Sequence, residues 1–255
     1  MDQTASIQDR FGPAAAAYVT SAVHRSGPDL DALLAAGVRT GHERVLDLGC
    51  GPGHTALAFA PRVAEAVGLD LTPAMLDAAR AQAMERGISN ARFEPGNAEA
   101  LPFPDASFDV VTSRHSAHHV ADPAAMLREV ARVLVPGGLF LLSDAVAPDD
   151  AASDTFLNAF EVLRDPSHVR DHREADWQAL LATAGLASEV LDRFVLEIDF
   201  EAWVTRIGTS AEATAGLRVL FDAAPAEVRA RFGLERPGDY DFQLPIAVLR
   251  AEPQA

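Results

Sequence analysis

The chain has 255 residues, of which 49% are hydrophobic and 23% charged, a composition typical of a globular protein with one sizeable core. A formal net charge of -16 argues against a phosphate backbone or an anionic membrane as the main partner, so we predict no nucleic-acid and no membrane partner. The single cysteine, Cys50, excludes an internal disulfide framework, and no apolar run resembles a membrane span or a secretion leader, so we expect a cytoplasmic protein.

The N-terminal segment carries helical patterns ahead of the first predicted strand. An alanine-rich helix is expected from Phe11 to Val19, and a second helix begins near Asp29 and stops at Gly37. Phe11 and Tyr18 fall on one helical face. The segment either packs on the sheet edge as scaffold or folds over a pocket as a lid. In the second case Tyr18 is a candidate substrate contact.

A glycine-rich turn follows the first predicted strand, which starts at Arg44. Gly49, Gly51 and Gly53 alternate, and a helix begins near His54. Glycines let the backbone turn sharply and let a ligand approach it, and the free N–H groups of the helix start face the turn. The spacing differs from the G-x-G-x-x-G of dinucleotide-binding proteins. Asp47, at the strand end, would repel a pyrophosphate but would suit the ammonium group of an amino-acid ligand.

A second acid ends the next predicted strand, which runs from Glu65 to Asp70. Thr72 and Pro73 are a strong helix start, and this helix stops at Gly87. Asp70 therefore lies at the carboxyl end of a strand, beside the glycine turn. A carboxylate there can accept hydrogen bonds from both vicinal hydroxyls of a ribose. A surface acid in a turn is the alternative.

Three further strands and a helix continue the alternation. Strands are expected over 91–94, 108–113 and 139–143, and the helix begins at Asp122 and is closed by Pro136. Strands that alternate with helices indicate right-handed βαβ units on a parallel sheet. Ligands bind at the carboxyl edge of such sheets. We expect five residues to converge there: Gly51, Asp70, Asn97, Ser113 and Asp144.

Four ordered motifs span about a hundred residues: 45–53, 67–70, 97–109 and 132–138. Together they resemble the motifs of the class I S-adenosylmethionine-dependent methyltransferases, in the small-molecule branch that includes the quinone-biosynthesis C-methyltransferases. The resemblance implies an α/β fold with a Rossmann-like, doubly wound, mostly parallel sheet of seven strands whose last strand is antiparallel. The helical patterns before the first strand, and those over 202–207 and 212–224, add N-terminal helices and a helical insertion between the last two strands.

The resemblance assigns roles toward the cofactor S-adenosylmethionine. Asp47 and the glycine turn would hold the methionine part, and Asp70 the ribose hydroxyls. Many relatives carry aspartate where this chain has Asn97, whose amide can still accept from the adenine amine and donate to a ring nitrogen. Leu71 and Met75 would flank the adenine. The full set expected to bind the cofactor is Asp47, Gly49, Gly51, Gly53, Asp70, Leu71, Met75, Asn97, Ala98 and Ser113.

Three histidines follow the fourth predicted strand: His115, His118 and His119. In a helix they would share one face, but no acid or cysteine nearby completes a ligand set, so we predict no metal. They either hydrogen-bond to loop backbone or act in catalysis. Methyl transfer is an in-line displacement in which the enzyme aligns the nucleophile and removes its proton if it has one. Histidine titrates in the right range. All three are catalytic candidates, and we expect His118 or His119 to face the substrate, with Arg114 as a neighbouring substrate contact.

The C-terminal part is predicted to carry specificity. An amphipathic helix over 154–163 precedes a loop that is rich in histidine and arginine. A solvated turn is one interpretation of this loop. Alternatively Arg164, His168 and Arg170 orient an anionic or carbonyl-bearing substrate. Helices are expected over 177–184, 202–207 and 212–224, and strands over 190–200 and 242–249.

We therefore predict a single methyltransferase domain: N-terminal helices or lid (1–43), a cofactor-binding core (44–150), and substrate-side helices with the last two strands (151–255). The expected reaction transfers a methyl group to an O, N, S or C atom of a small molecule and leaves S-adenosylhomocysteine. A monomer or homodimer is expected. One alternative is a non-methylating S-adenosylmethionine-binding protein, or an enzyme with other sulfonium chemistry, on the same scaffold, since the motifs report binding and not the reaction. A nicotinamide-dependent oxidoreductase is disfavoured by the glycine spacing, by Asp47 and by the lack of a Tyr-x-x-x-Lys pair.

Overall fold

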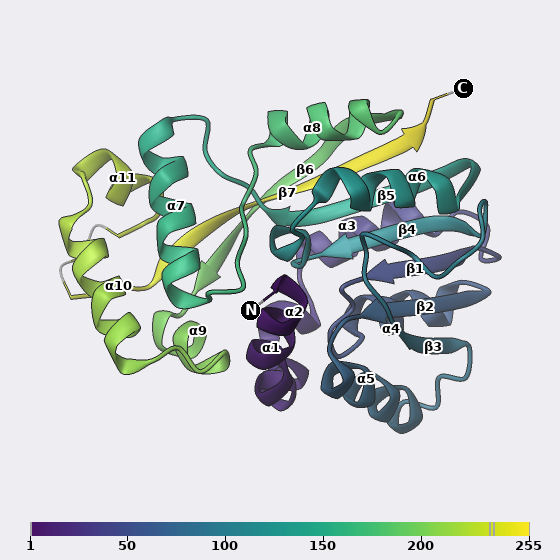
Figure 1. The fold of residues 1–255 in the computed structure, drawn as a ribbon, viewed down its shortest axis with the longest axis horizontal. Helices are drawn as coiled ribbons and strands as arrows, with labels where there is room; N and C mark the ends of the chain where they lie inside the picture. Colours follow the sequence, from purple (N-terminus) through teal and green to yellow (C-terminus); the bar gives the residue numbers. More distant parts are fainter. Residues whose placement is uncertain (1, 235, 237, 255) are drawn as a thin grey trace.

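One seven-stranded sheet runs through the computed structural model, which describes residues 2–234, 236 and 238–254 (Figure 1). The strand order is β3-β2-β1-β4-β5-β7-β6. β1 to β5 are parallel, and β7 runs antiparallel to both of its neighbours, β5 and β6. The predicted fold is therefore confirmed. The strands are β1 (Arg44–Leu48), β2 (Glu65–Asp70), β3 (Ala91–Pro95), β4 (Phe108–Arg114), β5 (Leu134–Ala145), β6 (Leu186–Ile198) and β7 (Phe242–Pro253).

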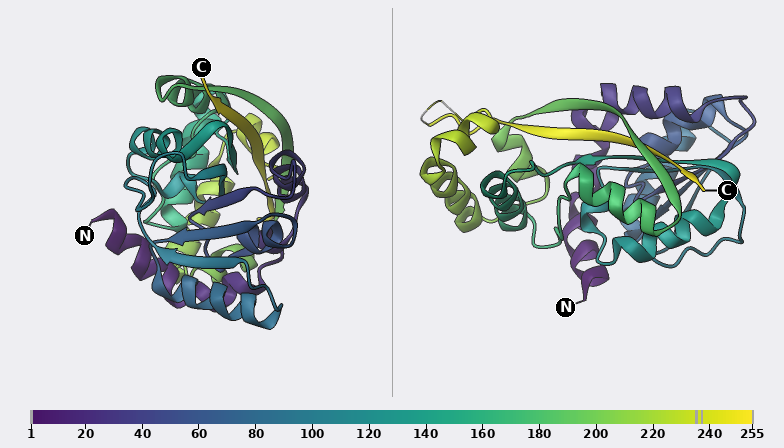
Figure 2. Two further views of the ribbon diagram at one scale, coloured as in Figure 1. Left: turned by 90° about the vertical axis from the view of Figure 1, so that its right-hand side faces the viewer. Right: turned by 90° about the horizontal axis from the view of Figure 1, so that it is seen from above.

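Helices cover both faces of the sheet (Figure 2). The helices are α1 (Gln3–Thr20), α2 (Ala22–Arg25), α3 (Pro28–Gly37), α4 (His54–Phe59), α5 (Pro73–Glu85), α6 (Pro123–Val133), α7 (Ala151–Arg164), α8 (Glu174–Thr183), α9 (Phe200–Arg206), α10 (Ala211–Ala223) and α11 (Ala226–Arg231), with short 3₁₀ turns η1 (Ala60–Arg62) and η2 (Ala117–His119). The helices α3, α4 and α5 pack on one face, and α6 and α8 on the other.

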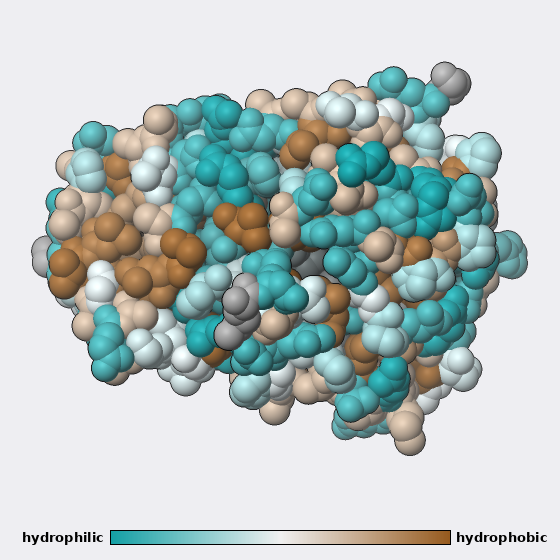
Figure 3. Space-filling view, in the orientation of Figure 1, coloured by the Kyte–Doolittle hydropathy of each residue, from teal (hydrophilic) through white to brown (hydrophobic). Residues whose placement is uncertain are grey.

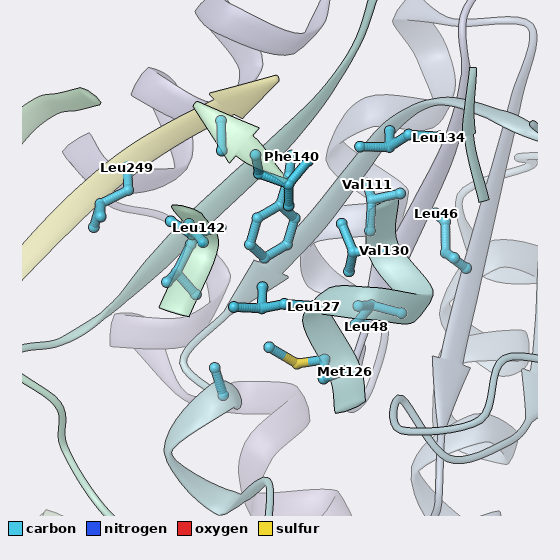
Figure 4. Close-up of a cluster of buried hydrophobic side chains, with 14 of the residues drawn as sticks. Leu46, Leu48, Val111, Met126, Leu127, Val130, Leu134, Phe140, Leu142 and Leu249 are labelled. Carbon is cyan, nitrogen blue, oxygen red and sulfur yellow. The ribbon is translucent and has the colours of Figure 1, made fainter. Parts of the chain in front are cut away.

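The core follows from the alternation of side chains along central strands. Val110 and Val111 of β4 are both fully buried, but they point to opposite faces. Val110 packs in the cluster beneath α4 and α5, whereas Val111 packs against Val130 of α6 (Figure 4). Burial on both faces explains why the central strands are continuous apolar runs instead of alternating ones.

A helical lobe stands beyond the carboxyl ends of β5 and β6. It is built from α7, α9, α10 and α11 (left in Figure 1), and its centre is aromatic, with Phe160, Trp203, Phe221 and Phe242 in contact. Apolar residues also gather on its outer surface (Figure 3). Because α9 to α11 lie between β6 and β7, the predicted helical insertion is confirmed.

Several element boundaries differ from the predictions. The first helix starts at Gln3, eight residues before the predicted start, because the Asp2 side chain caps it by accepting a hydrogen bond from Ala5 N. β5 starts at Leu134, so the predicted stop at Pro136 lies inside the strand, where the pairing with β4 shifts register. β6 likewise starts earlier, at Leu186, and the short helices α2 and α11 were not predicted.

The segment after β4 is not the continuous helix that would bring the three histidines to one face. His115 adopts a positive φ of 51°, which breaks any helix, and only the short turn η2 follows. The three histidine side chains therefore have different partners. The division into N-terminal, cofactor-binding and substrate-side regions stays a prediction.

Candidate active site

The glycine turn after β1 has the left-handed backbone that its sequence requires. Gly49, Gly51 and Gly53 have φ values of 62°, 50° and 86°. A Cβ at Gly49 would lie 2.6 Å from the Ser116 side chain, and one at Gly53 would lie 2.9 Å from the Phe93 ring. At Gly51 the nearest atom is Met75 Sδ at 4.0 Å, so this glycine borders open space. Two of the glycines thus serve packing, and the middle one leaves room on the cavity side.

Asp70 is tied to this turn. Its Oδ2 accepts from Gly51 N at 2.8 Å, and its Oδ1 accepts from Thr72 N at 2.8 Å. Burial raises the pKa of the Asp70 carboxyl, and the two backbone hydrogen bonds oppose that shift. The end of β2 is therefore held against the turn that ends β1, and the carboxylate keeps one free lone pair on each oxygen for a ligand.

A first cavity of about 1120 Å³ opens at the carboxyl ends of β1, β2 and β4. Most residues that were predicted to bind the cofactor border it, namely Gly49, Gly51, Asp70, Leu71, Met75, Asn97, Ala98 and Ser113. Tyr18, Arg114, His115 and His119 border it as well. The sheet edge thus brings together residues that are far apart in the sequence, as expected for a parallel sheet.

Asp47 and Gly53 are two corrections to this set, because neither borders the cavity. Asp47 is 2% exposed and lies behind the turn, where it accepts from Thr112 Oγ1 at 2.9 Å and from Ala56 N at 3.3 Å. Burial raises the pKa of Asp47 to about 7. Both residues therefore support the turn and the start of α4 from behind.

Helix α1 lies across the cavity, which favours the lid position over the sheet-edge position. Ile7, Phe11 and Tyr18 of α1 border the first cavity. Gln3 donates through Nε2 to the carbonyl oxygens of His119 and Ser167, at 2.9 and 2.7 Å. No sequence pattern singles out Gln3, because it precedes the predicted start of the helix.

Arg114 and His115 are engaged in a buried network. The Arg114 guanidinium donates to both carboxylate oxygens of Asp29 and to the carbonyl oxygens of Val23 and His24. His115 Nε2 lies 3.1 Å from Asp29 Oδ2. Burial alone would raise the pKa of Asp29, but hydrogen bonds from His115 and Arg114 hold it well below its usual range. Arg114 therefore fastens α3 to β4 and is not a free cation for a substrate, which corrects the prediction.

A second cavity of about 610 Å³ lies between the sheet edge and the helical lobe. It shares five lining residues with the first cavity: Phe11, Tyr18, His24, His115 and His119. Its remaining wall combines apolar side chains with buried acids and two arginines, including Leu196, Ile198, Trp203, Asp144, Glu161, Asp171, Arg164 and Arg206. The two cavities therefore meet at the histidine segment.

His118 is paired with an acid from the end of β5. Its Nδ1 lies 2.7 Å from Asp144 Oδ1, and its backbone N–H donates to Asp144 Oδ2 at 3.1 Å. Burial alone would lower the pKa of His118, but the Asp144 charge outweighs it and raises the pKa to about 10. Asp171 also lies 4.0 Å from His118 Nδ1. The expectation that no acid lies near these histidines is therefore wrong, because both acids come from distant segments.

His119 has the opposite environment. Its Nδ1 lies 3.0 Å from the carbonyl oxygen of Ser167, which can only accept, so Nδ1 carries the proton. Burial and the neighbouring His118 charge lower the pKa of His119 to about 4, so the ring is neutral. In that tautomer Nε2 keeps a free lone pair. Phe11 packs edge-on against this ring, with centroids 5.0 Å apart.

Of the three loop residues predicted to contact substrate, Arg164 borders the second cavity, whereas His168 and Arg170 border neither of these two cavities. Arg164 stacks on the Trp203 ring and donates to the Trp203 carbonyl oxygen. Arg170 pairs with Asp154 through both carboxylate oxygens. His168 is buried against Asn158, and burial lowers its pKa to about 2. Both side chains hold the loop together, so a substrate role for Arg170 and His168 stays a prediction.

Comparison with known proteins identifies the family. A family model described as a methyltransferase domain matches residues 46–142. The uncharacterized methyltransferase YcgJ of Bacillus subtilis is 42% identical over 222 residues, which cover 87% of this chain and 88% of YcgJ. The chain belongs to the methyltransferase family. It is an enzyme of that class, and the family implies S-adenosylmethionine as cofactor.

Solved structures of methyltransferase relatives agree with the fold. The crystal structure of YcgJ superposes with a TM-score of 0.86 at 39% identity, covering 89% of this chain and 98% of that one. A protein of Bacillus halodurans described as a putative methyltransferase gives 0.85 at 36% identity, covering 90% and 100%. The demethylmenaquinone methyltransferase of Deinococcus radiodurans is 45% identical, but the match covers only 41% of this chain and 44% of that protein.

The match to the quinone enzyme thus concerns less than half of the chain.

In the part of the chain that the structure describes, no helix is both long and apolar enough to cross a membrane.

Proposed function

We propose that this methyltransferase uses S-adenosylmethionine in the first cavity to methylate a small-molecule acceptor bound in the second. Two observations support this proposal. The two cavities share one set of lining residues, which includes His119, and only the first of the two is lined by the glycine turn that Asp70 holds in place. A cofactor in the first cavity would present its reactive group toward the junction, and an acceptor would approach from the lobe side.

The residues of the first cavity fit the cofactor by their donor chemistry. Asp70 offers free lone pairs to ribose hydroxyls, and its position is fixed by two backbone donors. Asn97 Oδ1 accepts from Glu99 N at 2.9 Å, so its side chain is held at the cavity wall with amide hydrogens left to donate. Leu71 and Met75 supply apolar surface for an adenine ring.

The cofactor supplies an activated methyl group on a sulfonium. The chain's own task is then to exclude water, to align the acceptor and to take a proton if the acceptor carries one. His119 is the residue best placed for the last role, because it borders both cavities and its Nδ1–H bond to Ser167 leaves Nε2 free. Its pKa of about 4 keeps Nε2 unprotonated but makes it a weak base, so it would take a proton from an acceptor that becomes acidic as the methyl group is transferred. Tyr18 and Phe11 of α1 border both cavities beside it and shield the junction.

His115 is not assigned a catalytic role, because its Nε2 lies against Asp29. We assign the acceptor to the small-molecule class because the second cavity lies between the sheet edge and the helical lobe and is lined by apolar side chains with a few buried polar groups, as small-ligand sites are. Its apolar wall of Leu196, Ile198 and Trp203 favours an acceptor with a hydrophobic body.

The test is incubation of the purified protein with S-adenosylmethionine that carries a labelled methyl group, together with panels of phenols, quinols, amines and thiols. Transfer of the label to a small molecule, with release of S-adenosylhomocysteine, supports the proposal. Binding of S-adenosylhomocysteine without transfer to any class would favour a non-methylating role for the same site. Transfer only to a macromolecule would overturn the choice of acceptor.

A further inference from the structure

Three ligand-type side chains converge at the second cavity. His118, Asp144 and Asp171 each place one nitrogen or carboxylate oxygen so that all three atoms lie within 4.8 Å of one another. They come from three segments: the turn after β4, the end of β5 and the loop before α8. Each of the two aspartates is 1% exposed.

Asp171 is the unusual member of this group. Among the residues that the structure describes, neither of its carboxylate oxygens has a hydrogen-bond partner, although both are buried. The nearest cationic or donor nitrogens, His118 Nδ1 and His168 Nε2, are both 4.0 Å away. Burying a carboxylate without a partner is costly, and buried carboxylates are normally paired or bound to a metal.

Neighbouring groups already use their own hydrogen bonds. Asp144 accepts from His118 Nδ1 and from the N–H groups of His118 and Ala145. His168 Nε2 lies 3.2 Å from Asn158 Oδ1. Within residues 2–234, 236 and 238–254, no protein group donates a hydrogen bond to the Asp171 carboxylate, which borders the second cavity. A cation is the ligand that this arrangement lacks.

The donor set selects the kind of cation. One imidazole and two carboxylates suit borderline divalent transition metals, whereas Mg²⁺ and Ca²⁺ prefer oxygen ligands alone. Two carboxylate charges match a divalent ion, and three protein ligands leave a position open, as in catalytic metal sites. We propose that His118, Asp144 and Asp171 bind a divalent transition-metal ion, such as Zn²⁺ or Mn²⁺, in the second cavity. The ion would displace to solvent the proton that His118 Nδ1 donates to Asp144, because an imidazole nitrogen binds a metal only in its unprotonated form.

The open coordination position would take an oxygen or sulfur atom of the acceptor, and a metal-bound hydroxyl loses its proton more readily than a free one. This role rests on the proposed function, but the site itself does not. An ion there would therefore favour acceptors with a hydroxyl or thiol group over amines that are already protonated.

The experiment titrates chelator-treated protein with ZnCl₂ and MnCl₂ by calorimetry, and measures bound metal after dialysis. The expected result is one ion per chain for the wild type. Asp171→Asn and His118→Gln each weaken binding by more than about tenfold, because each removes one ligand. The matched control is Asp176→Asn in the next helix, whose carboxylate pairs with Arg173 and not with the cluster.

Thermal unfolding gives a second measurement that a merely structural role of Asp171 would not reproduce. Zn²⁺ should raise the Tm of the wild type, since an ion that binds only the folded state stabilises it, and should leave the Tm of Asp171→Asn unchanged. Without metal, Asp171→Asn should be at least as stable as the wild type, because it removes a buried carboxylate that has no partner.

The proposal would be overturned if neither ion binds the wild type, or if Asp171→Asn binds the ion as tightly as the wild type does. A parallel titration with S-adenosylhomocysteine separates this failure from failure of the proposed function, because Asp171 does not border the first cavity.

Discussion

Arg114 Nε lies 2.5 Å from Asp29 Oδ2, and both side chains are almost completely buried. The pair joins the first turn of α3 to the end of β4, so the N-terminal helices are fastened to the wall of the first cavity. Arg114→Met would leave a buried carboxylate without its main counter-ion. The expected loss of stability is about 3–5 kcal/mol.

Urea unfolding of the two single variants and the double variant tests this pair. The double variant Asp29→Asn, Arg114→Met should lose less free energy of unfolding than the sum of the losses in the two single variants, since the two side chains act as a unit. The control is Arg128→Met, because Arg128 and its partner Asp122 are both more than half exposed. Arg128→Met should lower the free energy of unfolding by less than about 1 kcal/mol. If the losses of the two single variants simply add in the double variant, Arg114 and Asp29 do not act as a pair.

Gly49→Ala should destabilise the protein more than Gly87→Ala. The two glycines have almost the same φ, 62° and 64°, so both variants carry the same left-handed strain of about 1–2 kcal/mol. A Cβ at Gly87 meets nothing within 4 Å, whereas one at Gly49 would clash with Ser116 at 2.6 Å. Only Gly49→Ala should also weaken binding of S-adenosylhomocysteine. Equal losses of stability in chemical unfolding would show that the clash is relieved at no cost.

Asp47→Asn should change how stability depends on pH. The pKa of Asp47 rises from 3.8 to about 7 on folding, so between these values the folded state binds a proton that the unfolded state has released. This group therefore makes the free energy of unfolding fall as the pH rises from about 4 to about 7, by up to ~1.4 kcal/mol per pH unit.

Urea midpoints of the wild type and of Asp47→Asn between pH 4 and 8 measure this effect. The variant should lack that slope and should gain relative stability at the alkaline end. Asp77→Asn serves as control, because the Asp77 side chain is 76% exposed. Parallel pH profiles of the wild type and Asp47→Asn would contradict the assignment.

His119→Ala should separate turnover from cofactor binding. Nε2 of His119 is the free nitrogen at the junction of the two cavities, so its loss should lower kcat by about 10²–10⁴-fold for an acceptor that must lose a proton. Affinity for S-adenosylhomocysteine should change by less than about threefold, or about 0.6 kcal/mol. Single-turnover assays and calorimetry measure the two quantities. If His119→Ala binds the cofactor much more weakly but turns over normally, His119 serves cofactor binding and not catalysis.

Local patterns were sufficient for most of the fold. The strands and helices from Arg44 to Ala145 follow from apolar runs, caps and glycine stops, and helical patterns ahead of the last strand indicate the insertion. The reversed last strand follows from the family resemblance. In the sheet, the errors concern positions where long-range pairing extends a strand. β5 includes Pro136 because Leu134, before it, pairs with Phe108 of β4, and pairing with β4 resumes at Leu139 after a register shift.

The site was predicted less completely, because its partners come from distant parts of the chain. Asp144 lies 26 residues after His118, and Asp29 lies 85 residues before Arg114. Patterns of neighbouring residues cannot show that Arg114 has a carboxylate partner, or that an acid lies beside the histidines. The glycine turn and Asp70 were predictable because strand ends in a parallel sheet meet at one edge.

Calorimetric titration with S-adenosylhomocysteine tests whether the first cavity binds the cofactor, with NAD as the comparison ligand and Asp70→Ala as the matched variant. We expect one bound S-adenosylhomocysteine per chain, no binding of NAD, and at least tenfold weaker binding by Asp70→Ala, because hydrogen bonds to a charged group are worth about 1.5–3 kcal/mol. A folded wild type that binds NAD, or that does not bind S-adenosylhomocysteine, would contradict this expectation.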